Sequence, residues 1–150
     1  TELVALANHK PEVNQVELHP YLQQNELFAY CASENILLTA YSPLGSGDRS
    51  EGLKKEAEPS LLSDATLMDI AKKHQASVAQ VLIAWHLHRG NTVIPKSVTP
   101  SRIKENLEAA NLQLTPEDLI SIASLDRKYR FVDGTFFQKP GNGYTNIYDE

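Results

Sequence analysis

The sequence predicts an α/β fold in which short parallel strands alternate with helices. Three segments of β-forming residues end at turns: 13–17, 36–41, which stops at Ser42, and 92–94, which stops at Pro95. Helical patterns separate them, and such alternation implies parallel pairing through right-handed crossovers. The last two strands are dense apolar runs, which predicts that both of their faces are buried.

Capping residues delimit the helices. Ser77 begins the strongest pattern and Gly90 ends it, while Thr99 and Thr115 each precede a proline at the first helical position. The expected helices are 25–34, 64–74, 78–89, 100–110 and 116–125. The apolar positions expected to face the core include Leu67, Met68, Ile70 and Ala71 in the second, and Val81, Leu82, Trp85 and Leu87 in the third. Residues 1–7 read as the end of a further helix.

Composition excludes several classes of function. A chain of 150 residues can bury a sizeable core in one domain. The net charge of −5 argues against nucleic-acid binding, and no apolar run is long enough to span a membrane. The single Cys31 suits a reducing, cytoplasmic setting and a small packed residue rather than a nucleophile. The histidines show no metal-ligand spacing; His86 and His88 point to different helix faces, and His19 is structural.

The segment after the third strand predicts an anion site. The strand runs into Pro95 and Lys96, and Thr99 then caps a helix. Lys96, Ser97 and Arg102 therefore cluster at one helix N-terminus, where free N–H groups already favour negative charge. This combination fits a phosphate monoester. The alternative is a strand–turn–helix corner with ordinary surface charges.

Two other loops follow strands. Residues 45–62 form a polar loop whose length indicates a function. Its Gly-Ser-Gly start fails the GxGxxG pattern because Ser50 stands where a glycine is required, although Ser42 and Ser46 can donate to phosphate oxygens or form a simple turn. Gln15 can bind a planar carboxamide and Tyr41 can stack on a flat heterocycle; alternatively they are a half-buried polar pair.

Three blocks of the sequence resemble the second half of the aldo-keto reductase family. They are 13–21, 40–46, and 94–97 together with Arg102, Glu105 and Asn106, in the order and spacing of the family. The finer resemblance is to fungal aldose- and glyceraldehyde-type reductases. The family fold is a (β/α)8 TIM barrel that binds NADPH in an extended pose. The resemblance thus implies that this chain supplies the last three strands and their helices.

The resemblance also implies where the cofactor lies. Gln15 would hold the nicotinamide carboxamide and Tyr41 would stack under the ring. Ser42, Leu44 and Ser46 would line the pyrophosphate. Asp48 would help the loop close over it.

The rest of the implied cofactor site lies around the third strand. Lys96, Ser97 and Arg102 would bind the adenosine 2′-phosphate and so favour NADPH over NADH. Val98 and Thr99 belong to the same turn. Glu105 and Asn106 would contact the adenine.

The resemblance divides the chain into barrel elements, 1–125, and a substrate-side tail, 126–150, which is either a flap or a loosely docked end. The catalytic tetrad of the family (tyrosine, lysine, aspartate and histidine) belongs to the first half of the barrel, so no catalytic residue is assigned here. We expect the whole enzyme to reduce aldehydes or ketones, and the 150-residue chain alone to be inactive unless the first half or a complementing chain joins it. The alternatives are a non-catalytic NADPH-binding module or fragment, and an unrelated barrel half with a phosphate site.

Overall fold

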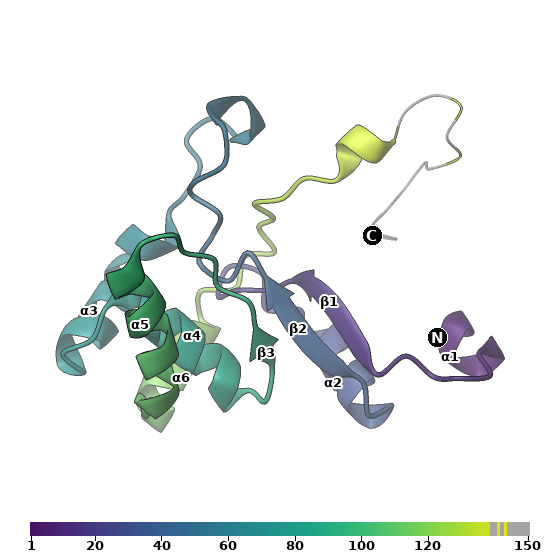
Figure 1. Ribbon diagram of the computed structural model, residues 1–150, viewed down its shortest axis with the longest axis horizontal. Coiled ribbons are helices and arrows are strands. Elements are labelled where there is room, and N and C mark those ends of the chain that lie inside the picture. Colours follow the sequence, from purple (N-terminus) through teal and green to yellow (C-terminus); the bar gives the residue numbers. More distant parts are fainter. Residues whose placement is uncertain (139–140, 142, 144–150) are drawn as a thin grey trace.

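A three-stranded parallel sheet forms the centre of the computed structural model, which describes residues 1–138, 141 and 143 (Figure 1). The strand order is β1 (Val13–Glu17), β2 (Leu37–Tyr41), β3 (Thr92–Val93). In the register, Val13 lies opposite Leu37 and Thr39 lies opposite Thr92. The predicted alternation of parallel strands and helices is therefore confirmed, with strand ends shifted by at most one residue.

The three helices with predicted caps begin directly after Ser77, Thr99 and Thr115. The helices are α1 (Glu2–Leu6), α2 (Asn25–Ser33), α3 (Ala65–Lys73), α4 (Val78–His88), α5 (Pro100–Glu108) and α6 (Pro116–Ala123). Short 3-10 turns are η1 (Glu51–Leu53), η2 (Leu61–Ser63), η3 (Ala109–Asn111) and η4 (Thr135–Phe137). Ser77 and Thr115 each form a capping box, which satisfies backbone N–H groups that the first helical turn leaves without partners.

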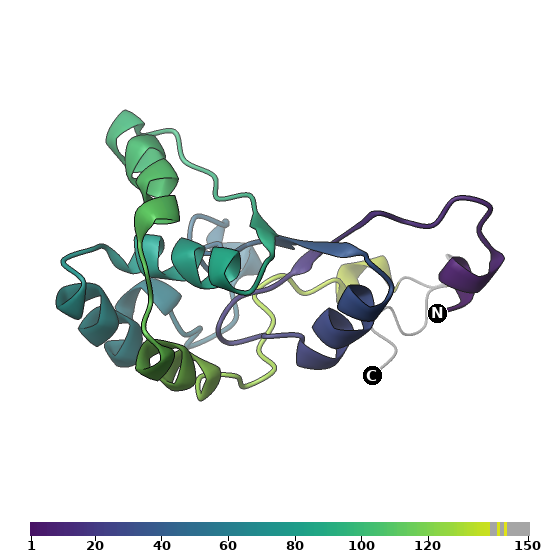
Figure 2. The ribbon, with the colours of Figure 1, turned by 90° about the horizontal axis from the view of Figure 1, so that it is seen from below.

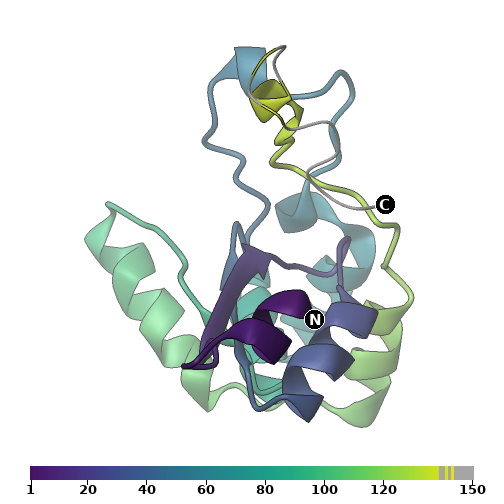
Figure 3. The same ribbon diagram turned by 90° about the vertical axis from the view of Figure 1, so that its right-hand side faces the viewer.

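The helices cover one face of the sheet. Figures 2 and 3 show α2, α3, α4 and α6 on one side, with α5 set apart near the segment that follows β3. Leu38 and Ala40 face this helical layer and are buried. On the opposite face Val13, Leu37 and Ile94 are 53%, 40% and 49% exposed, so the prediction of strands buried on both faces is wrong. The described residues supply a helical layer for one face only, and the open face keeps its apolar side chains in solvent.

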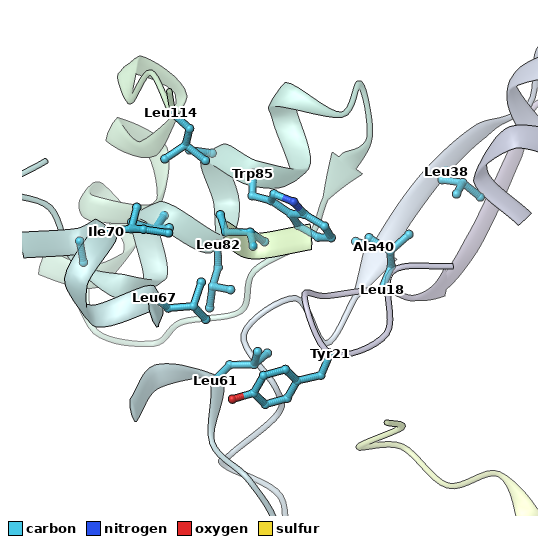
Figure 4. Packing of buried hydrophobic residues seen from close by; sticks show 14 of the residues in the cluster. Leu18, Tyr21, Leu38, Ala40, Leu61, Leu67, Ile70, Leu82, Trp85 and Leu114 are labelled. Carbon is cyan, nitrogen blue, oxygen red and sulfur yellow. The ribbon is translucent and has the colours of Figure 1, made fainter. Parts of the chain in front are cut away.

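The core lies between α3, α4 and the segment that follows β1. Figure 4 shows Leu67, Leu82 and Trp85 packed together, with Leu18 and Tyr21 completing the cluster. Cys31, also in this cluster, is a free buried thiol, as predicted for a packed residue.

Two apolar residues predicted to lie in the core are exposed. Met68 is 51% exposed, because α3 turns the face that carries Leu67, Ile70 and Ala71 toward α4 and Met68 lies one position further round the helix. Leu87 is 41% exposed in the last turn of α4, where it borders a hollow beside β3 and α5. Both predictions of burial are therefore wrong.

A buried carboxylate ties α3 to α6. Asp118 is the third residue of α6 and forms the capping box with Thr115, and it is only 4% exposed. Lys73 Nζ donates to one of its oxygens at 2.9 Å and His74 Nε2 lies 2.6 Å from the other. Burial alone would raise the pKa of Asp118, but the hydrogen bonds from Lys73, Thr115 and His74 outweigh it and hold this pKa well below its usual range.

His19 and His86 are buried within the scaffold. His19 is buried with Nε2 3.1 Å from Glu17 Oε1. His86 is fully buried while His88 is exposed, which confirms that they occupy different faces of α4. Neither ring nitrogen of His86 has a hydrogen-bond partner within the described chain. Burial, followed by repulsion from His19 and Arg89, lowers the pKa of His86 to about 3.

We predict that His86 makes the protein lose stability on acidification. Its folded pKa lies below the unfolded value, so the unfolded chain takes up a proton between pH 6.5 and about 3, and stability rises with pH in that window. The loss between pH 7 and pH 5 amounts to about 2 kcal/mol. The variant His86→Leu removes the titrating group without breaking a hydrogen bond of the described chain. Urea unfolding at pH 7 and pH 5 should then show a difference in the free energy of unfolding that is smaller by this amount. An unchanged pH dependence in the variant would contradict the assignment.

A membrane-spanning helix is not found in residues 1–138, 141 and 143, since none of their helices has the required length and apolarity.

Candidate functional site

The loops after β2 and β3 meet at a hollow of about 560 Å³. Parallel strands place their carboxyl ends on the same edge of a sheet, so these two loops are neighbours although they lie far apart in the sequence. The predicted cofactor residues that line the hollow are Ser42, Leu44, Ser46, Asp48, Lys96, Ser97, Val98, Thr99 and Arg102. Leu62, from η2, lines it as well. A volume of this size is typical of small-molecule sites.

An exposed ion pair links the two loops at the hollow. Lys96 Nζ lies 2.6 Å from Asp48 Oδ2, and their side chains are 70% and 64% exposed. The hydrogen bond from Lys96, together with its charge, lowers the pKa of Asp48 below its usual value. Exposed pairs contribute little to stability, so this contact can open without unfolding the chain.

The N-terminus of α5 forms the cationic side of the hollow. Thr99 is the N-cap residue and Pro100 occupies the first turn, as predicted, although the Thr99 side chain makes no capping hydrogen bond. Ser97 Oγ instead accepts from the Thr99 N–H at 3.2 Å. Lys96 and Arg102 stand before and within the first turn, where the helix already presents free N–H groups. Together they favour a group with two negative charges.

The opposite side of the hollow is a tight turn that carries two hydroxyls. Ser46 Oγ donates to Ser42 Oγ at 2.6 Å, and both residues have positive φ angles. Gly45 also has a positive φ of 86°, and a Cβ there would come within 3.3 Å of Phe131 and Leu61. Glycine meets both requirements at this position. Ser42 and Ser46 of this turn both line the hollow.

Gln15 and Tyr41 lie outside this hollow, on the open face of the sheet. Gln15 is exposed and pairs with Thr39, while Tyr41 is half-buried and pairs with Glu17. Side chains two residues apart in a strand share a face, so Gln15 and Tyr41 are diagonal neighbours. The structure therefore brings them together as the sequence predicted, next to the hollow rather than in it.

Glu105 and Asn106 do not line this hollow. Both are half-buried on α5, and the Gln80 side-chain amide donates to the Glu105 carbonyl at 3.3 Å. Asn106 borders a second hollow of about 570 Å³, which shares Lys96 and Ser97 with the first. Glu105 lines neither hollow.

The buried Tyr21 and the half-buried Tyr129 do not supply an acid to the hollow. The Tyr21 hydroxyl donates to Asp64 Oδ2 at 2.7 Å, and burial together with this bond raises the pKa of Tyr21 to about 12. Burial and the nearby Glu58 carboxylate also raise the pKa of Tyr129. Neither residue lines the hollow. The arrangement of the described residues can thus bind a phosphate-bearing ligand, and it presents no tyrosine in the hollow to protonate a substrate.

Sequence reasoning missed Glu17 and Arg49, which fix the surroundings of the site. The buried Glu17 carboxylate accepts from the backbone N–H of Phe131 at 2.6 Å, and Arg49 donates to the Phe131 carbonyl oxygen. A signal was available for each. Glu17 is a charged residue at the end of a β-strand. Arg49 directly follows Asp48 in the loop 45–62, whose length predicts a function.

The chain is similar in sequence to proteins of one family. The sequence profile of the Aldo/keto reductase family matches residues 2–127. The chain is 52% identical over 150 residues to Aldo/keto reductase slr0942 of Synechocystis sp., covering 99% of this chain and 46% of that protein.

Vertebrate relatives match as well. The chain is 50% identical over 131 residues to aldo-keto reductase family 1 member A1-A of Danio rerio and 44% identical to member A1 of Bos taurus, covering 87% of this chain and 40% of each relative. It thus spans less than half the length of these relatives. The likeness to fungal enzymes stays a prediction. The chain belongs to the aldo-keto reductase family.

Proposed function

We propose that the whole protein reduces aldehydes and ketones to alcohols with NADPH, and that this chain carries most of the cofactor contacts. The observation that carries the proposal is the hollow at the carboxyl edge of the sheet. Two cations, three hydroxyl-bearing serines and a helix N-terminus line it from two different loops. The family membership supports the reaction class, and the hollow supports the cofactor.

The hollow fits the phosphate groups of NADPH. A 2′-phosphate monoester would lie against Lys96, Ser97 and Arg102, since charge-assisted hydrogen bonds to a dianion are stronger than those to a neutral hydroxyl. Ser42 and Ser46 would donate to the pyrophosphate. Asp48, bound to Lys96, would hold the loop across it. An NADH molecule, which has a hydroxyl in place of the 2′-phosphate, would offer Lys96 and Arg102 no anionic group at this position.

The open face of the sheet extends this site. NADPH, when bound, supplies the hydride. Gln15 would hold the nicotinamide carboxamide and Tyr41 would lie against the ring, because both share the open face beside the hollow. The acid that protonates the carbonyl oxygen would come from the part of the barrel outside this chain.

We further propose that β1, β2 and β3 are the last three strands of a (β/α)8 barrel. Val13, Leu37 and Ile94 would then face its interior, where the remaining strands cover them. In this arrangement the barrel elements come from residues 1–125, and the tail 126–150 borders the substrate. Tyr144 and Tyr148 of this tail lie outside the described residues. The free buried thiol of Cys31 supports a reducing compartment such as the cytoplasm.

One observation favours a second candidate function. The residues that line the hollow include no tyrosine or histidine within the described chain. A module that binds NADPH without turnover would have the same hollow.

We predict that the full-length protein oxidises NADPH when glyceraldehyde is added. The measurement is the loss of absorbance at 340 nm, with NADH as the control cofactor. Turnover with NADPH supports the reductase, whereas tight NADPH binding without turnover would support the binding module.

We predict that the double variant Lys96→Ala, Arg102→Ala lowers NADPH affinity by about 100-fold, because two charge-assisted contacts of about 1.5 kcal/mol each are lost. Affinity for NADH should change by less than about 3-fold, since NADH has no 2′-phosphate. Fluorescence titration with both cofactors measures this. Lys104→Ala is the matched control, since Lys104 lies on α5 and pairs with Glu108 outside the hollow. NADPH binding as tight as in the parent would contradict the cofactor assignment.

A further inference from the structure

The segment 129–133, here called the tail segment, is fixed to the carboxyl end of β1. Glu17 is 1% exposed, and its carboxylate accepts from the backbone N–H of Phe131 at 2.6 Å and of Val132 at 3.2 Å. The Phe131 ring is 2% exposed and packs 4.8 Å from the His19 ring. A loosely docked end is thus excluded for these residues. The tail segment reaches the carboxyl end of β1, whose Gln15 belongs to the proposed nicotinamide site.

Arg49 joins the tail segment to both ends of the loop 45–62. Its side chain is 13% exposed. Nε donates to the Ser46 carbonyl oxygen at 3.2 Å, and the guanidinium also donates to the Glu58 carboxylate and to the Phe131 carbonyl oxygen. The planar guanidinium of arginine holds five N–H donors in fixed directions, which suits three acceptors that come from different segments. Since Ser46 lines the phosphate hollow, one side chain connects this hollow to the tail segment.

Further contacts hold the same two segments together. Lys55 Nζ donates to the Arg130 carbonyl oxygen at 3.2 Å and lies 5.0 Å from the centre of the Tyr129 ring. The Tyr129 hydroxyl donates to Glu58 Oε2 at 3.5 Å. Loop and tail segment also border a hollow of about 280 Å³ between them. These contacts are weaker or more exposed than those of Arg49, which places Arg49 at the centre of the junction.

Two adjacent residues of the loop, Asp48 and Arg49, connect it to two different parts of the chain. Asp48 binds Lys96 across the phosphate hollow, and Arg49 binds the tail segment. The Asp48–Lys96 pair is exposed and free to open, while the contacts of Arg49 and Glu17 are largely buried. The buried contacts of the tail segment can therefore hold the loop through Arg49 while the Asp48–Lys96 pair opens and closes.

We propose that Arg49 is a positioning residue that couples the loop 45–62 to the tail segment, so that the anchored tail segment holds the loop in its closed position. This rests on the proposed function: the loop would cover the cofactor phosphates, and the tail segment would border the carbonyl substrate beside Gln15. Cofactor and substrate then favour the same closed arrangement, and each strengthens the binding of the other by the same factor.

Hydrogen exchange of the full-length protein without nucleotide tests the junction itself. In Arg49→Met the amides of Phe131 and Val132 should exchange at least about 10-fold faster, although their acceptor Glu17 is intact. Lys54→Met is the matched control, because Lys54 lies in the same loop and, within the described part of the chain, its charge pairs with Glu51 rather than with the tail segment. Unchanged exchange at Phe131 and Val132 in Arg49→Met overturns the proposal.

A conservative variant covers the case in which Arg49→Met does not fold. Arg49→Lys keeps the charge near Glu58 but loses the planar fork, so the same two amides should exchange faster than in the parent, by a smaller factor. Exchange equal to the parent in Arg49→Lys would overturn the proposal.

Kinetics test the consequence for the reaction. In Arg49→Met the dissociation constant for NADPH and the KM for glyceraldehyde should rise together, each by at least about 5-fold, with little loss of kcat, because no group at the reacting atoms has changed. Weaker NADPH binding with an unchanged KM would show that Arg49 serves the loop alone and would overturn the coupling. If the parent protein does not oxidise NADPH, the proposed function fails. The exchange result still decides whether Arg49 couples the loop 45–62 to the tail segment.

Discussion

Parallel pairing of β1, β2 and β3 is the constraint on which the site depends. Because the three strands run in the same direction, Glu17 at the end of β1 lies at the same carboxyl edge of the sheet as Ser42 and Lys96, which follow β2 and β3. The pairing between β2 and β3 is short, and a 2.6 Å contact between the Thr39 and Thr92 hydroxyls reinforces it. If β3 ran in the opposite direction, Lys96 would lie at the opposite edge of the sheet, and the hollow between the loops after β2 and β3 would not form.

The charged contacts fall into two groups with different roles. Asp118 and Glu17 are buried, and their hydrogen bonds fix α3 against α6 and the tail segment against β1. Removing a partner from such a group leaves an unsatisfied buried charge, which is strongly destabilising. The pair of Asp48 and Lys96 is exposed and contributes little to stability. The buried contacts thus maintain the scaffold, and the exposed pair is the one suited to open for a ligand.

The fold was predicted well where its causes are local. Ser77 and Thr115 cap their helices through bonds to residues three positions away, and the sequence displays such patterns directly. The cluster around residues 96–102 was predicted for the same reason. Arg49 reaches Phe131 across 82 residues and Glu17 reaches it across 114, and no local pattern specifies those partners. The open face was missed because apolar composition does not say which segments cover a strand.

The account is tested most directly by comparing how 2′,5′-ADP and 5′-ADP bind to the full-length protein, by isothermal titration calorimetry. The two ligands differ only in the 2′-phosphate, which we propose is bound in the hollow lined by Lys96 and Arg102. The account predicts that 2′,5′-ADP binds at least about 10-fold more tightly, since a single charge-assisted contact is worth about 1.5–3 kcal/mol. Equal affinities would contradict it, because Lys96 and Arg102 would then not distinguish a nucleotide that carries the 2′-phosphate from one that lacks it.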